Sequence, residues 1–252
     1  MKTGIFFTVR TGSTRLPGKA LLEVKGRPII SYLVERVKHA AEGYGKLIIC
    51  TTTLPEDLRL EKLARQYGAD LFQGDPENIV KRHWECAEKY KFDFIVNVDG
   101  DDILCDPSYI VKNIEMAQQL PEYDVYKSVH LPFGVNSMGY RKKVLDRIME
   151  GFKRKKLDTG WGQLINNKEA FRVYEFPPIA EDMMDVRLSL DYDEDLTVFK
   201  KIIEDVFKDG KHISHKEILD YLKANPDVAA INSHVDKRYW ENYNTKKAEE
   251  GR

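Results

Sequence analysis

Strand-like apolar runs alternate with helix-like amphipathic segments through the first half of the chain. The strand-like runs are Ile5–Val9, Lys46–Thr51, Asp70–Gln73 and Phe92–Val98. The helix-like segments that follow them are Pro28–Ala41, Thr53–Gly68, Asp75–Tyr90 and Asp106–Gln119. Alternation of this kind is typical of a parallel sheet covered by helices. The pattern therefore places the chain in the α/β class, and Thr53, Asp75 and Asp106 are the expected N-caps of the last three helices.

The second half of the chain is less regular. A strand-like stretch at 123–140 is interrupted by Pro132 and Gly134, and a strongly basic helix is expected at 141–157. The charges of that helix either face solvent or contact an anionic acceptor. The turn-rich segment 158–162 holds Trp161, whose ring could belong to a lid or to a subunit contact. Further strands are expected at 172–177 and 186–190, and further helices at 193–208 and 214–224.

Charge and cysteine content exclude several classes of protein. The 252 residues include 40 basic and 41 acidic side chains, for a net charge of −1, which argues against a general nucleic-acid or membrane-surface binder. Cys50, Cys86 and Cys105 are widely spaced, which argues against a disulfide scaffold or a zinc site. With no visible signal peptide or membrane span, a cytoplasmic protein is expected. We expect one domain over 1–245, an acceptor or dimerisation insert at about 123–180, and a frayed tail at 246–252.

A basic, glycine-punctuated loop directly follows the first strand. It reads Arg10-Thr-Gly-Ser-Thr-Arg15-Leu-Pro-Gly-Lys19. Its spacing matches neither the dinucleotide-binding glycine motif nor a P-loop, because Lys19 is followed by Ala20. Glycines allow close backbone approach to a ligand, and arginine can bind phosphate oxygens bidentately. The loop is therefore either a triphosphate cradle, with Arg15 and Lys19 on the outer phosphates, or a solvated surface loop.

Carboxylates gather where two later strands are expected to end. Asp99, Asp101 and Asp102 follow the strand-like run Phe92–Val98, and Asp191 follows the candidate strand 186–190. Ligands of open α/β sheets bind at the carboxyl ends of strands. Mg²⁺ prefers oxygen ligands and often bridges carboxylates to phosphates. Asp101 and Asp191 are the preferred metal candidates, whereas the alternative for the first group is an ordinary acidic turn. Asp193, Glu194 and Asp195 fit the first turn of a helix, where acidic side chains favour the dipole.

These motifs together resemble the cytidylyltransferases that activate acidic sugars. Arg10–Lys19 with the following Ala-Leu, and Gly26-Arg-Pro-Ile-Ile, look very like the N-terminal signature of that family. Gly100-Asp101 with Asp106-Pro107 looks like its metal-site strand end, and Arg187-Leu-Ser-Leu-Asp191 is similar to a later element. Asn225-Pro226 through Asn232 resembles the end of the spore-coat polysaccharide members. The resemblance spans most of residues 3–235.

The resemblance implies a three-layer, Rossmann-like nucleotidyltransferase fold with a mostly parallel central sheet. It also implies CTP as donor, Mg²⁺ as cofactor and a homodimer. By motif position, the nucleotide-binding residues would be Arg10, Thr11, Gly12, Ser13, Arg15, Lys19 and Asp99. Lys19, Arg15 and Asp101 would be catalytic, and Asp101 and Asp191 would bind the metal. Residues 133–162, where the acceptor is expected, depart from the family pattern.

The expected reaction is transfer of CMP from CTP to an acidic sugar, with release of pyrophosphate, for surface polysaccharide or glycoconjugate biosynthesis. A phosphorylated or phosphonate acceptor stays open. A metal-dependent glycosyltransferase using Asp99-Gly100-Asp101 is a second class, although it would not need the basic loop after strand one. A non-catalytic nucleotide-binding protein is a third. The expected partners are CTP and a small anionic acceptor, with no nucleic acid and no membrane.

Overall fold

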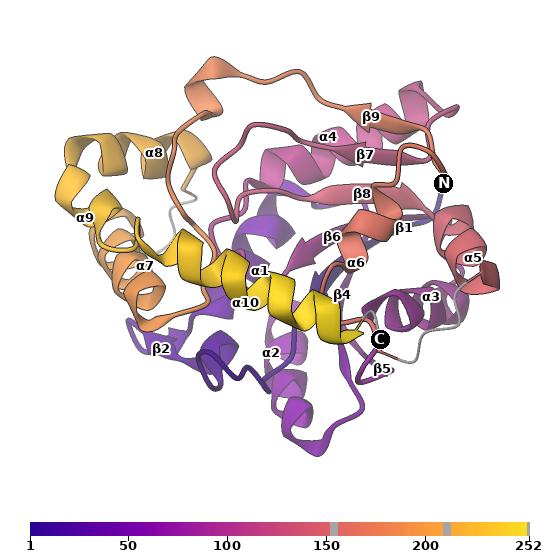
Figure 1. Ribbon diagram of the computed structural model, residues 1–252, viewed down its shortest axis with the longest axis horizontal. Coiled ribbons are helices and arrows are strands. Elements are labelled where there is room, and N and C mark those ends of the chain that lie inside the picture. Colours follow the sequence, from indigo (N-terminus) through magenta and orange to yellow (C-terminus); the bar gives the residue numbers. More distant parts are fainter. Residues whose placement is uncertain (152–155, 209–212, 251–252) are drawn as a thin grey trace.

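A computed structural model of the protein describes residues 1–151, 156–208 and 213–250. A seven-stranded sheet forms its centre (Figure 1). The strand order is β5 (Asp70–Gly74), β4 (Lys46–Thr52), β1 (Thr3–Thr8), β6 (Phe94–Asp99), β8 (Met138–Arg141), β7 (Val125–Lys127) and β9 (Val173–Glu175). Among these described strands only β8 runs antiparallel to its neighbours. The expected mostly parallel sheet is confirmed.

Helices cover both faces of this sheet and produce three layers (Figure 1). One face carries α1 (Ile30–Ala40), α2 (Leu60–Tyr67), α4 (Pro107–Gln119), α7 (Asp193–Val206) and α8 (His215–Ala224). The other face carries α3 (Ile79–Tyr90), α5 (Lys142–Gly151) and α6 (Trp161–Ile165). Successive side chains of a strand point to opposite faces. Accordingly, Ile5 and Phe7 belong to one apolar cluster and Phe6 to the other, so β1 is buried on both sides.

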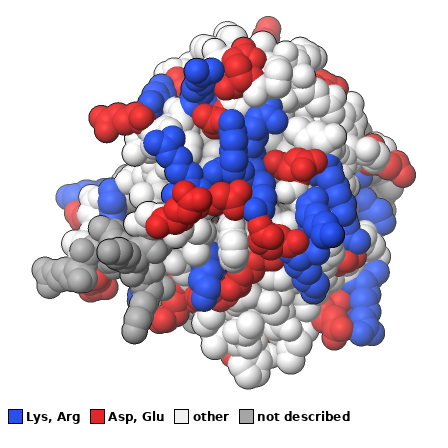
Figure 2. All heavy atoms as spheres, turned by 90° about the vertical axis from the view of Figure 1, so that its right-hand side faces the viewer, with Lys and Arg blue, Asp and Glu red and all other residues white. Residues whose placement is uncertain are grey.

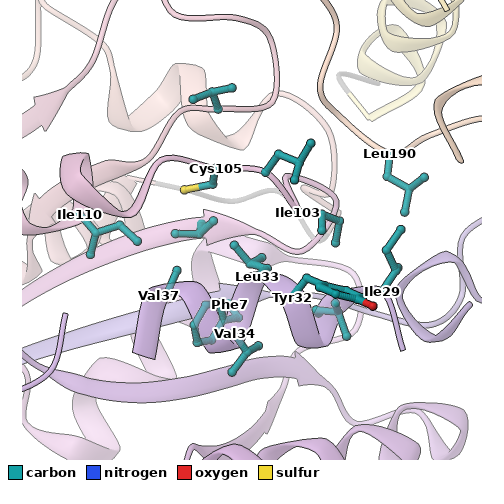
Figure 3. Packing of buried hydrophobic residues seen from close by; sticks show 14 of the residues in the cluster. Phe7, Ile29, Tyr32, Leu33, Val34, Val37, Ile103, Cys105, Ile110 and Leu190 are labelled. Carbon is teal, nitrogen blue, oxygen red and sulfur yellow. The ribbon is translucent and has the colours of Figure 1, made fainter. Parts of the chain in front are cut away.

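The larger core shows why α1 forms where the sequence predicts it. Leu33, Val34 and Val37 lie on one stripe of this helix, and all three are fully buried. Figure 3 shows them around Phe7 of β1, and Ile103, from the segment that follows β6, belongs to the same cluster. Removing an aliphatic side chain of this size from water contributes about 1.5–3 kcal/mol each. The stripe therefore fixes which face of α1 meets the sheet.

Seven further elements complete the described chain. They are η1 (Lys19–Leu21), the hairpin β2 (Glu23–Val24) and β3 (Arg27–Pro28), η2 (Pro55–Arg59), η3 (Ala180–Asp182), α9 (Pro226–Ala230) and α10 (Val235–Glu250). None of the described helices is both long and apolar enough to cross a membrane. The long helix α10 runs across the molecule from α9 (Figure 1).

Two of the three expected helix caps are wrong. Thr53 is not a cap, because Pro55 begins a 3₁₀ turn (η2) before α2. Asn78, not Asp75, caps α3: its side chain accepts from the Lys81 amide, whereas Asp75 accepts from the Glu77 and Asn78 amides in the preceding turn. Asp106 does cap α4, as expected.

The later part of the chain also differs from expectation. Residues 187–190 are buried, but 186–190 form no strand and make only an isolated bridge, between Arg187 and Phe133 in the loop before β8. Segment 158–162 is not all loop, since α6 begins at Trp161. The tail expected to fray is helical through Glu250. Residues 152–155 of the expected basic helix lie outside the described residues.

The described part of the basic helix is matched by acidic side chains. Lys142 pairs with Glu88 and Asp146, and Lys143 pairs with Asp124. Figure 2 shows acidic and basic groups interleaved on the face that carries α5. Exposed pairs of this kind contribute little to stability. Their arrangement favours a solvated face for this segment.

The sheet brings distant segments together at one edge. In the register of β1 with β6, Thr8 lies opposite Asp99, so the basic loop and the acidic turn start side by side. Gly100 allows this contact, because a Cβ at that position would lie 2.6 Å from Cβ of Val9. The Leu190 amide donates to the Asp101 carbonyl at 2.9 Å, which brings Asp191 to the same edge.

Candidate active site

The basic loop is tied down at its start by a buried carboxylate. Both the amide and the Oγ1 hydroxyl of Thr11 donate to Oδ1 of Asp57 at 2.7 Å. Asp57 also accepts from Thr52. Burial alone would raise the pKa of Asp57, but these donors lower it, so the carboxylate stays charged. Thr11 therefore anchors the loop, and neither it nor Gly12 lines the neighbouring cavity. The sequence pattern gave no sign of Asp57.

Lys19 and Arg15 turn inward toward the acidic strand ends. The Nζ of Lys19 donates to Asp101 at 2.8 Å and to Asp191 at 2.9 Å. Burial would lower the pKa of Lys19, but Asp101 and Asp191 raise it, so the ammonium stays protonated. Arg15 also donates to Asp191, and its guanidinium lies 5.3 Å from the ring centroid of Tyr239. The loop is thus not a solvated surface loop at these two positions.

Asp191 is a buried acceptor for three cations. Besides Lys19 and Arg15, it accepts from Nη2 of Arg187 at 2.7 Å. Burial would raise the pKa of Asp191, but the charge of Lys19 and then of Arg15 lowers it to about 2. Arg187 in turn donates to Asp195 at 3.0 Å, and Asp195 accepts from the amides of Asp191 and Tyr192. The expected structural role of Asp195 in the first turn of α7 is confirmed.

Asp99, Asp101 and Asp102 form a second acidic group. Each offers a carboxylate oxygen, and these oxygens lie within 4.8 Å of one another. Burial and the nearby Asp101 raise the pKa of Asp99 to about 7, and burial together with Asp101 and Asp99 raises the pKa of Asp102 well above its ordinary value. Carboxylates repel one another in this way until a cation neutralises them. An oxygen-only set of this geometry fits a hard divalent ion such as Mg²⁺.

The two acidic groups meet at Lys19. Its ammonium lies between Asp101 and Asp191, so the predicted metal pair is joined here by a protonated amine. Among the described residues, Asp99, Asp101 and Asp102 form a group of three carboxylates close enough to share an ion, whereas Asp191 contacts Lys19, Arg15 and Arg187. Asp101 is common to the prediction and to this cluster.

A cavity of about 280 Å³ opens beside these groups. The basic loop contributes Arg10, Ser13, Arg15 and Lys19, and the acidic turn contributes Asp99 and Asp101. Ser13 faces this cavity while its Oγ accepts from the Leu16 amide at 3.3 Å. Arg10 pairs with Asp158, which joins the loop to the segment that opens α6. Of the six loop residues with side-chain donors, all except Thr11 therefore line one cavity, Thr14 included.

Helix α10 forms a wall of this cavity, which sequence reasoning missed. Tyr239, Tyr243 and Lys246 line the cavity, and Nζ of Lys246 lies 3.4 Å from Oγ1 of Thr14. Asn242 donates to the Tyr192 hydroxyl at 2.8 Å and holds the helix to the start of α7. The spacing of Tyr239 and Tyr243, four residues apart, was the available signal.

A second cavity of about 460 Å³ adjoins the first through Asp99 and Trp161, which line both. Its other lining residues are mostly polar and come from β6 and the acidic turn after it, from β7, β8 and the loop between them, and from α6 and its C-cap: Asn97, Asp102, Lys127, Ser128, Val129, His130, Asn136, Ser137, Met138, Gly162 and Asn166. The indole of Trp161 is nearly buried and packs edge-on against the ring of His83 at 5.2 Å. Trp161 is thus a wall between two cavities.

A mostly parallel sheet between two layers of helices, with a basic loop and an acidic turn at the carboxyl ends of its strands, defines a nucleotidyltransferase fold. A family model described as cytidylyltransferase matches residues 8–206. The chain therefore belongs to the cytidylyltransferase family, and it is by family a CTP-dependent nucleotidyltransferase. The resemblance found in the motifs is confirmed.

Individual relatives agree with this assignment. The chain is 26% identical to an uncharacterized protein of Methanocaldococcus jannaschii over 91% of its own length and 93% of that protein. It is 35% identical to a 3-deoxy-manno-octulosonate cytidylyltransferase of Trichlorobacter lovleyi, but over only 42% of its length and 41% of the relative. The chain thus aligns with less than half of that enzyme.

Solved structures share the fold. A cytidylyltransferase from Leptospira borgpetersenii superposes with a TM-score of 0.81 at 24% identity, covering 91% of this chain and 97% of that chain. A CMP:2-keto-3-deoxy-manno-octonic acid synthetase complexed with CTP superposes with a TM-score of 0.64 at 18% identity, covering 82% of this chain and 100% of that chain.

Proposed function

We propose that the protein transfers CMP from CTP to an acidic sugar, with Mg²⁺ as cofactor and pyrophosphate as the second product. The observation that carries this proposal is the position of Lys19, which bridges Asp101 and Asp191 at the wall of one cavity. Cations for a triphosphate and carboxylates for a metal thereby face each other. This is the pairing that nucleotidyl transfer needs, since catalysis there depends on positioning and charge stabilisation.

Each side of the cavity has a separate task in this proposal. Asp101, with Asp99 and Asp102 beside it, would hold Mg²⁺. When bound, the ion supplies charge neutralisation at the α-phosphate. Lys19 and Arg15 exchange part of their carboxylate contacts for the β- and γ-phosphates and neutralise the departing pyrophosphate. Arg10 and Ser13 seat the nucleotide from the loop side. Asp191 keeps the two cations charged and aimed before CTP arrives.

The second cavity is the proposed acceptor site, and its chemistry favours a sugar acid. Lys127 is its one described lysine or arginine, and it is already paired with Glu175 at 3.2 Å. The remaining polar groups are largely amides and hydroxyls, and Oδ1 of Asn166 is buried with no partner among the described residues. Such groups suit sugar hydroxyls and a single carboxylate. A phosphomonoester dianion would call for more cations, usually arginine.

A pyrophosphate-release screen tests the proposal. Four nucleoside triphosphates are crossed with acidic sugars, phosphosugars and phosphonates, with and without Mg²⁺. We expect release with CTP, Mg²⁺ and an acidic sugar. Turnover with phosphosugars alone would move the acceptor to the phosphorylated class, and transfer of a sugar without pyrophosphate release would favour the glycosyltransferase alternative built on Asp99-Gly100-Asp101. Within the acidic-sugar panel, Lys127→Met should raise the acceptor KM more than the CTP KM.

We further propose a homodimer in the cytoplasm and a role in surface polysaccharide or glycoconjugate biosynthesis. The family resemblance supports the dimer. Sedimentation velocity across a concentration range measures the assembly state, and a single monomeric species at every concentration would refute the dimer. Loss of a CMP-sugar from cells that lack the protein would support the biosynthetic role.

A further inference from the structure

A chain of hydrogen bonds runs from the buried middle of the sheet to the acidic group. The Tyr140 hydroxyl lies 2.8 Å from Nδ1 of His83, and Nε2 of His83 lies 2.7 Å from Oγ1 of Thr8. Oγ1 of Thr8 also bonds to Oδ1 of Asn97, and Nδ2 of Asn97 donates to Oδ1 of Asp99 at 3.0 Å. Four elements contribute to it: β8, α3, β1 and β6.

The donors and acceptors of this chain fit together in one direction. Nδ2 of Asn97 donates to Asp99, which leaves Oδ1 of Asn97 to accept from Thr8. The Thr8 hydroxyl then gives its proton to Asn97 and must accept from Nε2–H of His83. That leaves Nδ1 of His83 unprotonated, and Tyr140 donates to it. One tautomer of a neutral imidazole therefore satisfies every group.

The surroundings keep the ring neutral and still. His83 and Tyr140 are fully buried, and Thr8 and Asn97 are nearly so. Burial and the neighbouring charge of Arg82 lower the pKa of His83 to about 3. Phe6 packs edge-on against the same imidazole at 5.5 Å, as Trp161 does from the cavity side. A buried ring held on both nitrogens and by two aromatic edges has little freedom to rotate.

We propose that His83 is a positioning residue for the transfer site: through Thr8 and Asn97 it fixes the carboxylate of Asp99 in the acidic group, and by packing it fixes Trp161 between the two cavities. His83 touches neither substrate. The expected effect on the reaction rate rests on the proposed function. The direction of the hydrogen bonds from Tyr140 to Asp99 is a property of the folded protein alone.

The tautomer of His83 gives the first test. Ring ¹⁵N chemical shifts of histidine-labelled protein, assigned with His83→Gln, report which nitrogen carries the proton. We expect the Nε2–H form from pH 6 to pH 8, with no charged form. The Nδ1–H tautomer, or a protonated ring in that range, would overturn the proposed direction of the chain whether or not the protein transfers CMP.

Substitutions in the chain give the second test. Thr8→Val keeps the shape of a strand residue but cuts the chain, whereas Thr8→Ser keeps the hydroxyl. Loss of a group that orients a metal-binding residue typically costs about 10–100-fold in activity or metal affinity. We therefore expect Thr8→Val to lower kcat about tenfold or more with little change in the CTP KM, and Thr8→Ser to recover most of that loss. Equal losses in both variants would refute the positioning role.

Tyr140→Phe has a matched control in Tyr126→Phe. Both remove a hydroxyl from a buried tyrosine of the sheet, but the Tyr126 hydroxyl bonds to the Leu120 and Tyr123 carbonyls, away from the cavities. We expect Tyr140→Phe to lower kcat and raise the Mg²⁺ concentration needed for half-maximal rate, and Tyr126→Phe to leave both unchanged. If the two variants change kcat and the Mg²⁺ requirement equally, His83 has no positioning role and is only part of the core. An inactive wild type with the expected tautomer would instead refute the proposed function.

Discussion

Replacing Asp191 with Asn should destabilise the protein at neutral pH by an amount that shrinks as the pH falls toward 2. The carboxylate of Asp191 is 1% exposed and accepts from Lys19, Arg15 and Arg187. These cations hold its pKa at about 2, against an ordinary value of 3.8. At about 1.36 kcal/mol per unit, this difference corresponds to about 2.5 kcal/mol of folding free energy.

The sign of the pH effect follows from the direction of the shift. A carboxylate with a lowered pKa in the folded state binds fewer protons there than in the unfolded state. Its contribution is complete above about pH 4 and is lost as the pH falls through about 2. At pH 7 Asp191→Asn should cost about 3–5 kcal/mol, because three cations lose one buried partner.

Urea unfolding at several pH values between 7 and 2 measures both the loss of stability in Asp191→Asn at pH 7 and its dependence on pH. The stability gap between wild type and Asp191→Asn should narrow by about 2 kcal/mol from pH 5 to pH 2. Asp193→Asn is the matched control, since Asp193 is an exposed acid two residues away, and it should stay within about 0.5 kcal/mol of wild type. A constant gap across this pH range would mean that Asp191 is not held by cations as described.

Three further substitutions test the site. Asp101→Ala should abolish CTP-dependent pyrophosphate release while the circular dichroism spectrum stays native, and wild-type turnover would remove Asp101 from the metal site. Lys19→Met should weaken CTP binding about tenfold or more in calorimetry, since a buried phosphate partner is lost, and an unchanged affinity would contradict the cradle. Asp99→Asn should stabilise the metal-free protein above pH 7 by up to about 4 kcal/mol, because burial and Asp101 raise the pKa of Asp99 to about 7 and its charge there is unfavourable. Mg²⁺ should then raise the melting temperature of the wild type but not of this variant.

The sequence was sufficient for the sheet because its parallel strands are buried on both faces. Such strands read as continuous apolar runs, and β1, β4 and β6 all began within two residues of the predicted positions. The stretch 186–190 alternates apolar with polar residues and is buried from Arg187 to Leu190, yet it makes only an isolated bridge. The sequence pattern reports which side chains are buried. Whether a buried segment forms a β-strand depends on which other segment its backbone lies beside, and the whole fold decides that.

The site was predictable where one local motif carries it. Arg15, Lys19 and Asp101 follow strand ends and are brought together by the parallel register of β1 and β6. Asp57 was not predictable, because nothing local marks it, and the spacing of Tyr239 and Tyr243 does not by itself say that α10 reaches the cavity. Asp57 acts by accepting from the amide of Thr11, 46 residues away, and α10 reaches the cavity by crossing the molecule.

The shared wall of the two cavities suggests how donor and acceptor meet. Asp99 and Trp161 line both, whereas Arg15 and Lys19 line only the first and Lys127 and Asn166 only the second. In-line displacement at the α-phosphorus requires the entering oxygen and the leaving pyrophosphate on opposite sides. The cations that would stabilise pyrophosphate line only the first cavity and the proposed acceptor groups line only the second, so the two roles fall to different cavities. Because Asp99 stands at the junction, the orientation imposed on it through His83 would act on the transfer step rather than on the binding of either substrate.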